Sequence, residues 1–139
     1  MRVSQRLDYA LRAMTALAAV PAGEYVVAGD LADRLGLPRR FLEQQLTAVA
    51  KRGLVTCQRG AGGGCALARP ASEISVAEIV RALQGEVLDV PHVTGSAVSE
   101  MWAHAAAGLQ KEFEVVDLAT LAKRQAEFDA ASSPAMYYI

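Results

Sequence analysis

Residues 31–43 read Leu31-Ala32-Asp33-Arg34-Leu35-Gly36-Leu37-Pro38-Arg39-Arg40-Phe41-Leu42-Glu43, and residues 57–65 read Cys57-Gln58-Arg59-Gly60-Ala61-Gly62-Gly63-Gly64-Cys65. Gly36 stops a helix of about residues 29–35, and Pro38 opens a second helix that Gly53 ends. Two short strands, about 54–58 and 64–68, flank the glycine-rich turn. A helix, a turn, a second helix and a hairpin in this order predict a winged helix-turn-helix.

The rest of the sequence predicts further helices. Ser4 can cap a first helix, and Ser75-Val76-Ala77-Glu78 has the form of a capping box, with Ile74 and Ile79 placed as its hydrophobic staple. A long helix is expected from about residue 96 to 115, and Asp117 caps a last one. The predicted fold class is therefore mainly α with a small β-hairpin wing.

Three parts differ in character and in charge. Residues 1–84 form the winged helix-turn-helix, residues 85–95 a linker, and residues 96–139 the long helix and the C-terminal helix. Residues 1–84 carry a formal charge of +4 and residues 85–139 carry −5, which together give the net charge of −1. The basic part suits a polyanion, whereas the acidic part is better suited to pairing subunits or docking an effector.

Composition excludes several classes of protein. The 139 residues are 53% hydrophobic and 21% charged, which is typical of one folded domain with or without an appendage. No run of 18 apolar residues and no signal peptide is recognisable, so we expect neither a membrane span nor a membrane partner. Two cysteines are too few for a disulfide framework, and a cytoplasmic location is the default expectation. No nucleophile–base pair, metal-ligand set or acid pair indicates an enzyme.

The helix that follows Pro38 is the candidate recognition helix. Such helices present their N-terminal residues to the DNA major groove. Here these residues are Arg39, Arg40, Glu43, Gln44 and Thr47. Arginine grips guanine or phosphate, glutamine pairs with adenine, and glutamate accepts from cytosine. The alternative is an ordinary solvated face of a core helix, but the preceding turn and the following hairpin favour DNA.

The hairpin tip is the second candidate DNA contact. Its glycines allow positive φ and a close approach of the backbone to a ligand, and Gly60 lies beside Arg59, which can neutralise phosphate or enter a narrow minor groove. A nucleotide-binding P-loop is excluded because no Lys-Ser/Thr follows and a strand, not a helix, comes next. The alternative is a simple tight turn, which would need fewer glycines.

The motifs Leu-Ala-x-x-Leu-Gly, Phe-Leu-Glu-Gln, Lys-Arg-Gly-Leu-Val, Arg-Gly-x-Gly-Gly-Gly and Leu-Ala-Arg-Pro follow one another between residues 31 and 70. Together with the run Ile-Ser-Val-Ala-Glu-Ile-Val at residues 74–80, they resemble the Rrf-type (IscR/NsrR/CymR-like) bacterial winged-helix transcriptional regulators. The resemblance covers nearly the whole chain. It implies a homodimer joined by the long helix of each subunit, and phosphate contacts from Arg2, Ser4 and Tyr9.

The apolar stripe of the long helix would then be the dimer interface. An intramolecular core stripe is the alternative. The stripe consists of Val98, Met101, Trp102, Ala105, Leu109 and Phe113.

The sequence departs from the cluster-bearing members of this family, which hold three cysteines around the start of the dimer helix. Residues 87–101 contain no cysteine, and thiolates are the usual ligands of iron–sulfur clusters. We therefore predict no cofactor and no metal site, and expect His92 to be a linker residue and His104 a structural or surface residue. The alternative is a sensor with non-standard ligands, in which His92 binds an effector or metal.

Cys57 and Cys65 are equidistant from residue 61, so a symmetric hairpin places them opposite each other. The hypothesis is a reversible cross-strand disulfide that stiffens or displaces the wing. Opposed Cβ atoms lie about 4.5–5.5 Å apart and a disulfide needs about 3.5–4.5 Å, which predicts strain. The alternative is a pair of small residues that only fill strand positions.

The sequence therefore predicts a homodimeric transcriptional regulator, a repressor, that binds a palindromic operator in double-stranded DNA through the recognition helix and the wing. A small-molecule or redox effector is left open. The competing interpretation is a winged-helix adaptor that binds protein and not DNA.

Overall fold

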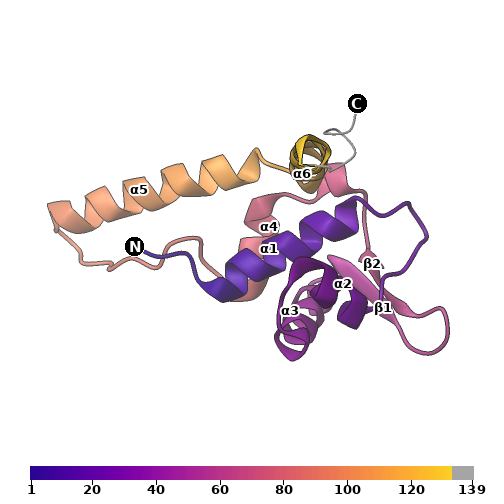
Figure 1. Ribbon diagram of the computed structural model, residues 1–139. Coiled ribbons are helices and arrows are strands. Elements are labelled where there is room, and N and C mark those ends of the chain that lie inside the picture. Colours follow the sequence, from indigo (N-terminus) through magenta and orange to yellow (C-terminus); the bar gives the residue numbers. More distant parts are fainter. Residues whose placement is uncertain (133–139) are drawn as a thin grey trace.

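The computed structural model describes residues 1–132, so the last seven residues of the predicted C-terminal part, 133–139, lie outside the described chain. The fold is mainly helical with one antiparallel hairpin, as the sequence predicts (Figure 1). Its elements are α1 (Gln5–Ala18), α2 (Ala28–Leu35), α3 (Arg39–Lys51), β1 (Val55–Gln58), β2 (Gly64–Leu67), the 3-10 helix η1 (Ala71–Glu73), α4 (Val76–Gln84), α5 (Ala97–Glu114) and α6 (Leu118–Ala131). Across residues 1–132 no helix has the length and apolar character needed to cross a membrane.

Local capping chemistry sets the helix ends. The Ser4 hydroxyl accepts a hydrogen bond of 3.1 Å from the Leu7 N–H at the start of α1, and Gly36 ends α2 in the left-handed conformation with φ of 67°. At α4 only half of the predicted capping box forms. The Ser75 hydroxyl accepts from the Glu78 N–H at 3.2 Å, but the Glu78 carboxylate pairs with Arg69.

The core of the winged helix-turn-helix includes the start of the C-terminal helix. Leu118 is fully buried, and α6 packs back against α1 and η1. Backbone hydrogen bonds from Val76 N–H to Val116 O (2.8 Å) and from Leu118 N–H to Ile74 O (3.0 Å) tie the two segments together. One hydrophobic core therefore includes residues from both sides of the predicted boundary at residue 84. Its largest fully buried side chains are Met14, Leu31, Leu42, Val49, Ile74, Ile79, Val80 and Leu118.

The wing is tied to the segment before α2. In the hairpin Cys57 lies opposite Cys65, the register that the sequence predicts. On its other side Cys65 pairs with Val26, because the Cys65 N–H donates to Val26 O (2.8 Å) and the Val26 N–H donates to Cys65 O (2.9 Å). Gly64 makes this approach possible, since a Cβ at Gly64 would lie 2.6 Å from the Val26 carbonyl.

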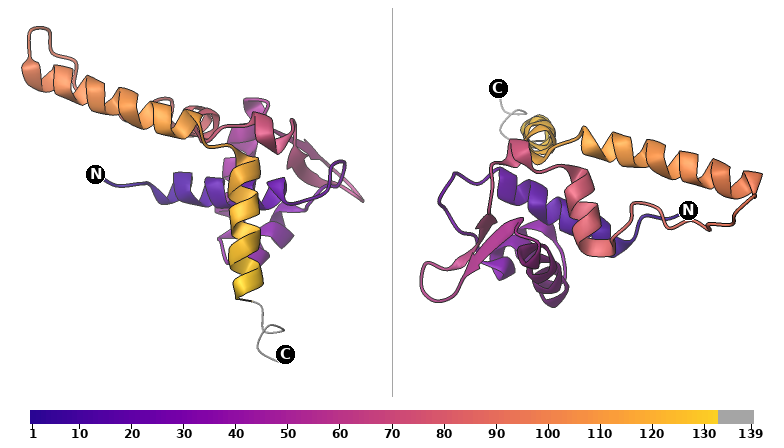
Figure 2. Two further views of the ribbon diagram at one scale, coloured as in Figure 1. Left: turned by 90° about the horizontal axis from the view of Figure 1, so that it is seen from above. Right: turned by 180° about the vertical axis from the view of Figure 1, so that it is seen from behind.

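Helix α5 extends away from the rest of the molecule, and residues 85–95 run out beside it before the chain turns back (Figures 1 and 2). The structure describes all of α5 and buries only Ser99 in it, whose hydroxyl accepts from the Val93 N–H at 3.1 Å. Helix α5 and the α3–hairpin pair lie on opposite sides of α1 (Figure 1). The long helix is therefore remote from the recognition helix.

Gly64→Ala should destabilise the protein more than Gly62→Ala. Both glycines have positive φ, but a Cβ at Gly62 meets nothing within 4 Å, whereas at Gly64 it would strike the Val26 backbone. We expect an additional loss of about 1–3 kcal/mol in the free energy of unfolding for Gly64→Ala. Urea denaturation of both variants measures this difference, and equal losses would show that the Val26 contact does not constrain the wing.

Candidate nucleic-acid interface

Helix α3 separates its two faces as the sequence predicts. Leu42, Leu46 and Val49 are buried in the core. The five predicted recognition residues are all exposed, and they are Arg39, Arg40, Glu43, Gln44 and Thr47. These side chains offer donors and acceptors that match base edges and phosphates.

The first turn of α3 has the charge and the open backbone N–H groups that favour binding of an anion. Two arginines occupy it where the helix dipole favours acids, at a cost of about 0.3–1 kcal/mol each. No side chain caps this N-terminus, and open N–H groups at a helix start bind phosphate well. This locally unfavourable arrangement becomes favourable when a polyanion lies against it.

The two arginines have different surroundings. Arg39 Nη2 lies 3.3 Å from Asp33 Oδ2, and its guanidinium covers Gly29, where a Cβ would come within 2.8 Å of Arg39 Cζ. Arg39 is thus held against α2. Within residues 1–132 Arg40 makes no side-chain hydrogen bond or ion pair. Of the two, Arg40 is therefore the one whose guanidinium has no partner in the described chain.

Sequence reasoning missed two residues that hold α3 in place. Arg6 Nε, on α1, donates a hydrogen bond of 2.8 Å to Gln45 Oε1, and Gln45 is only 5% exposed. A signal was present, because Leu42, Gln45, Leu46 and Val49 stand at i, i+3, i+4 and i+7, so Gln45 is a polar residue on the apolar face. A buried amide requires a partner, and Arg6 supplies it.

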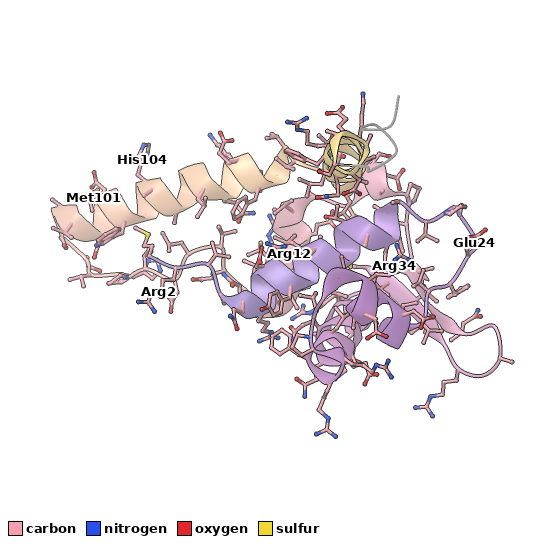
Figure 3. The ribbon with its side chains drawn as sticks, viewed as in Figure 1. Arg2, Arg12, Glu24, Arg34, Met101 and His104 are labelled. Atoms are coloured by element: carbon pink, nitrogen blue, oxygen red, sulfur yellow. A yellow bond between two sulfur atoms is a disulfide. The ribbon has the colours of Figure 1, made fainter. Side chains whose placement is uncertain are left out.

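The N-terminal residues expected to touch phosphate have different environments. Tyr9 is half-buried, and its ring meets Phe41 edge-on at 5.6 Å between centroids. The Ser4 oxygen accepts from the start of α1 and keeps its hydroxyl proton free to donate. Arg2 is exposed and lies on the opposite side of α3 from the hairpin (Figure 3). The N-terminal segment and the wing therefore flank α3.

The wing tip presents Arg59 and Gly60 to solvent, as predicted. Gly60 has φ of 90°, and its carbonyl accepts a 3.0 Å hydrogen bond from the Gly63 N–H. A Cβ at Gly63 would lie 2.5 Å from the Gln58 carbonyl, so the tip can close only around glycine. Gln58 also donates to the Tyr25 hydroxyl at 3.2 Å. The glycines thus give a thin tip that carries one arginine.

The apolar stripe of α5 is mostly open. Val98 and Met101 are 61% and 52% exposed, and Ala105 is exposed as well. Trp102 and Leu109 are half-buried. At the other end Phe113 packs against the molecule's own core, so for this residue the structure favours the intramolecular alternative.

The helix-turn-helix formed by α2 and α3, followed by the β1–β2 hairpin, is the architecture of a winged helix, a fold that many transcription regulators use to bind DNA. The model of the Rrf2 family, described as "Iron-dependent Transcriptional regulator", matches residues 3–124. A Mycobacterium tuberculosis protein named as an HTH-type transcriptional regulator, Rv1287, is 34% identical over 131 residues, which span 88% of this chain and 81% of that protein. The chain therefore belongs to the Rrf2 family of transcriptional regulators and is not an enzyme.

Solved structures support the same conclusion. The structure of CymR, the global cysteine regulator of B. subtilis, matches with a TM-score of 0.80 and 25% identity, over 89% of this chain and 98% of that one. IscR of T. potens matches with a TM-score of 0.79 and 31% identity, over 99% of this chain and 97% of that one.

The family description names iron, but the side chains in the described part of this protein that could ligate iron are not arranged as an iron site. Residues 87–101 contain no cysteine, and Cys57 and Cys65 are joined to each other in the wing. His92 and His104 are both exposed, and His104 points away from the rest of the molecule (Figure 3). Within residues 1–132 no three His, Cys, Asp or Glu side chains gather as a metal site requires.

A double-mutant cycle between Tyr9→Leu and Phe41→Leu should give a coupling of about 0.5–1.5 kcal/mol in the free energy of unfolding, because the edge-on ring contact joins α1 to α3. Tyr9→Phe keeps that contact and should leave the unfolding energy unchanged. Thermal denaturation of the wild type, the two single leucine variants, the double variant and Tyr9→Phe measures these differences. A coupling near zero would mean that the ring of Tyr9 does not hold α3.

Proposed function

We propose that this regulator binds a palindromic operator in double-stranded DNA as a homodimer and acts as a repressor. The observation that carries the proposal is the uncapped first turn of α3, where exposed Arg39 and Arg40 stand against the helix dipole. An anion against this turn would stabilise it, because Arg39 has Asp33 as an acidic partner and Arg40 has none within residues 1–132. Repression requires only that a protein occupy the operator. The surface formed by α3 and the wing would be sufficient for this.

Each DNA-facing element has a distinct role in the proposal. Arg40, Glu43 and Gln44 read base edges in the major groove, while Arg39, held beside Asp33, contacts phosphate. Arg59 at the wing tip contacts backbone or a narrow minor groove. Flanking phosphate contacts come from the N-terminal segment, through Arg2, Ser4 and Tyr9.

The homodimer interface is proposed along α5. A helix that extends from the molecule with exposed Val98, Met101 and Ala105 leaves apolar surface in water. A second copy of the same helix would cover it, and a twofold dimer presents two recognition helices to the two half-sites of a palindrome. We further propose that the protein acts without an iron–sulfur cluster, because the donor set described above cannot hold one.

The first test is selection of bound sequences from random duplex DNA at two salt concentrations, after anaerobic purification and an absorption spectrum. A colourless dimer that enriches one palindrome supports the proposal, and Arg40→Ala should abolish the enrichment. Absent or salt-insensitive DNA binding would favour the protein-binding adaptor. A coloured protein would contradict the cluster-free proposal and favour a sensor with non-standard ligands.

Arg59→Ala should reduce operator affinity and flatten its dependence on salt. If Arg59 makes one phosphate contact, the slope of log K against log salt should change by about one unit. Fluorescence anisotropy over a range of salt concentrations measures both quantities. Gln58→Ala, one residue earlier and uncharged, should leave the slope unchanged. A wild-type slope in Arg59→Ala would remove the wing tip from the interface.

Ala105→Asp should break the homodimer, whereas Ala107→Asp should not. Both alanines are exposed on α5, but two residues correspond to a rotation of about 200°, so only Ala105 shares the face with Val98 and Met101. A charge buried in a dimer interface is strongly unfavourable. Light scattering with size exclusion reports the mass of each variant. If both variants were dimers, or both were monomers, the assignment of this α5 face as the dimer interface would be contradicted.

A further inference from the structure

We propose that the Cys57–Cys65 bond of the wing is a reversible redox modification site. A small-molecule or protein thiol reduces it, a disulfide oxidant restores it, and the oxidised wing binds DNA more tightly than the reduced wing. The effect on affinity rests on the proposed DNA-binding function, whereas the redox chemistry of the wing does not.

The strand register brings the two cysteines together. The backbone N–H and C=O of Cys65 are both bonded to Val26, so they point away from β1. Cys57 and Cys65 are therefore a non-hydrogen-bonded pair of the antiparallel ladder, the kind in which Cα atoms approach most closely. Their Cα atoms lie 4.2 Å apart and a disulfide joins them. The pairing thus follows from the way the wing is attached to the segment before α2.

The two cysteine residues differ in exposure. Cys57 is exposed on β1, whereas Cys65 is 7% exposed and belongs to the hydrophobic core. A reductant thiolate can therefore reach Cys57 Sγ, form a mixed disulfide there and release Cys65 as a thiolate, which takes up a proton. A second reductant thiolate attacks the reductant sulfur of the mixed disulfide and releases Cys57. Two thiols are oxidised to one disulfide, and the wing gains two electrons and two protons.

The fold can accommodate both redox states. After reduction the Cys65 thiol remains in the core as a small apolar side chain. Its two hydrogen bonds with Val26 and the packing of β2 do not depend on the disulfide. Reduction therefore removes the link between the strands without opening a cavity, which a reversible site requires.

The consequence of reduction falls on β1 and the tip. β1 has four residues, three of them exposed, and pairs with only one strand. Two-stranded hairpins are marginally stable by themselves. The exposed Arg59 follows Cys57 by two residues, so the disulfide restrains the residue that approaches DNA. A restrained tip loses less conformational freedom on binding, and we expect about a tenfold higher affinity, the equivalent of ordering about one residue.

The test measures three quantities across dithiothreitol redox buffers: free thiols by alkylation and mass spectrometry, amide hydrogen exchange of residues 58–64, and affinity for the selected operator. Reduction should expose two thiols, speed exchange at the tip and weaken binding about tenfold. Cys57→Ser, which changes an exposed side chain and leaves the core intact, should show the reduced affinity in every buffer. Thr56→Ser, on the same strand, should respond like the wild type.

Each of these measurements can support or overturn the redox proposal. Equal affinities of the oxidised and reduced wild type, or a redox response that persists in Cys57→Ser, would overturn it. If neither form binds any DNA, the proposed function fails, and hydrogen exchange still decides the redox site. Faster exchange at the reduced tip would support a redox-controlled wing, and identical exchange in both states would overturn it.

Discussion

The pair of backbone hydrogen bonds between Cys65 and Val26 is the constraint on which the position of the wing relative to α3 depends. A two-stranded hairpin has little stability by itself, and this pairing adds a third short stretch of backbone to it. Because Val26 lies two residues before the start of α2, the wing is fixed to the helix-turn-helix and not merely to the chain that follows α3. Gly64 is required for the approach, so one residue without a side chain sets the position of the wing relative to the recognition helix.

The same surface contains several features that cost stability. Two arginines at the start of α3 oppose its dipole, and the hairpin tip is rich in glycine, which has the most conformational freedom to lose on folding. Helices α1, α4 and α6 follow local preference, with Ser4, Ser75 and Asp117 as N-caps, whereas α2 begins at Val27 without a side-chain cap. Natural sequences often break local rules where they bind or react, and the opposed arginines and the glycine-rich tip are two such breaks, in α3 and the wing.

The sequence predicted what is local and missed what is distant. Helix ends and the Cys57–Cys65 register came from caps, glycines and hairpin symmetry within a few residues. The hydrogen bond from Arg6 to Gln45 joins residues 39 apart, and no short-range pattern names the partner. The packing of Leu118 into the core was hidden for the same reason. The Glu78 carboxylate of the capping box pairs with Arg69, a residue outside the motif, so the motif alone did not predict its partner. The exposure of the five predicted recognition residues was predictable because it follows from helical periodicity.

Placing α5 on the far side of α1 from α3 also separates the charges of the chain in space (Figure 1). Residues 1–84 carry +4 and residues 85–139 carry −5, so the molecule has a permanent electric dipole moment although its net charge is only −1. In the field of a polyanion such a dipole experiences a torque, and its positive end turns towards the source. In the proposed DNA complex the acidic C-terminal part would therefore favour productive orientation during diffusional encounter without itself contacting DNA.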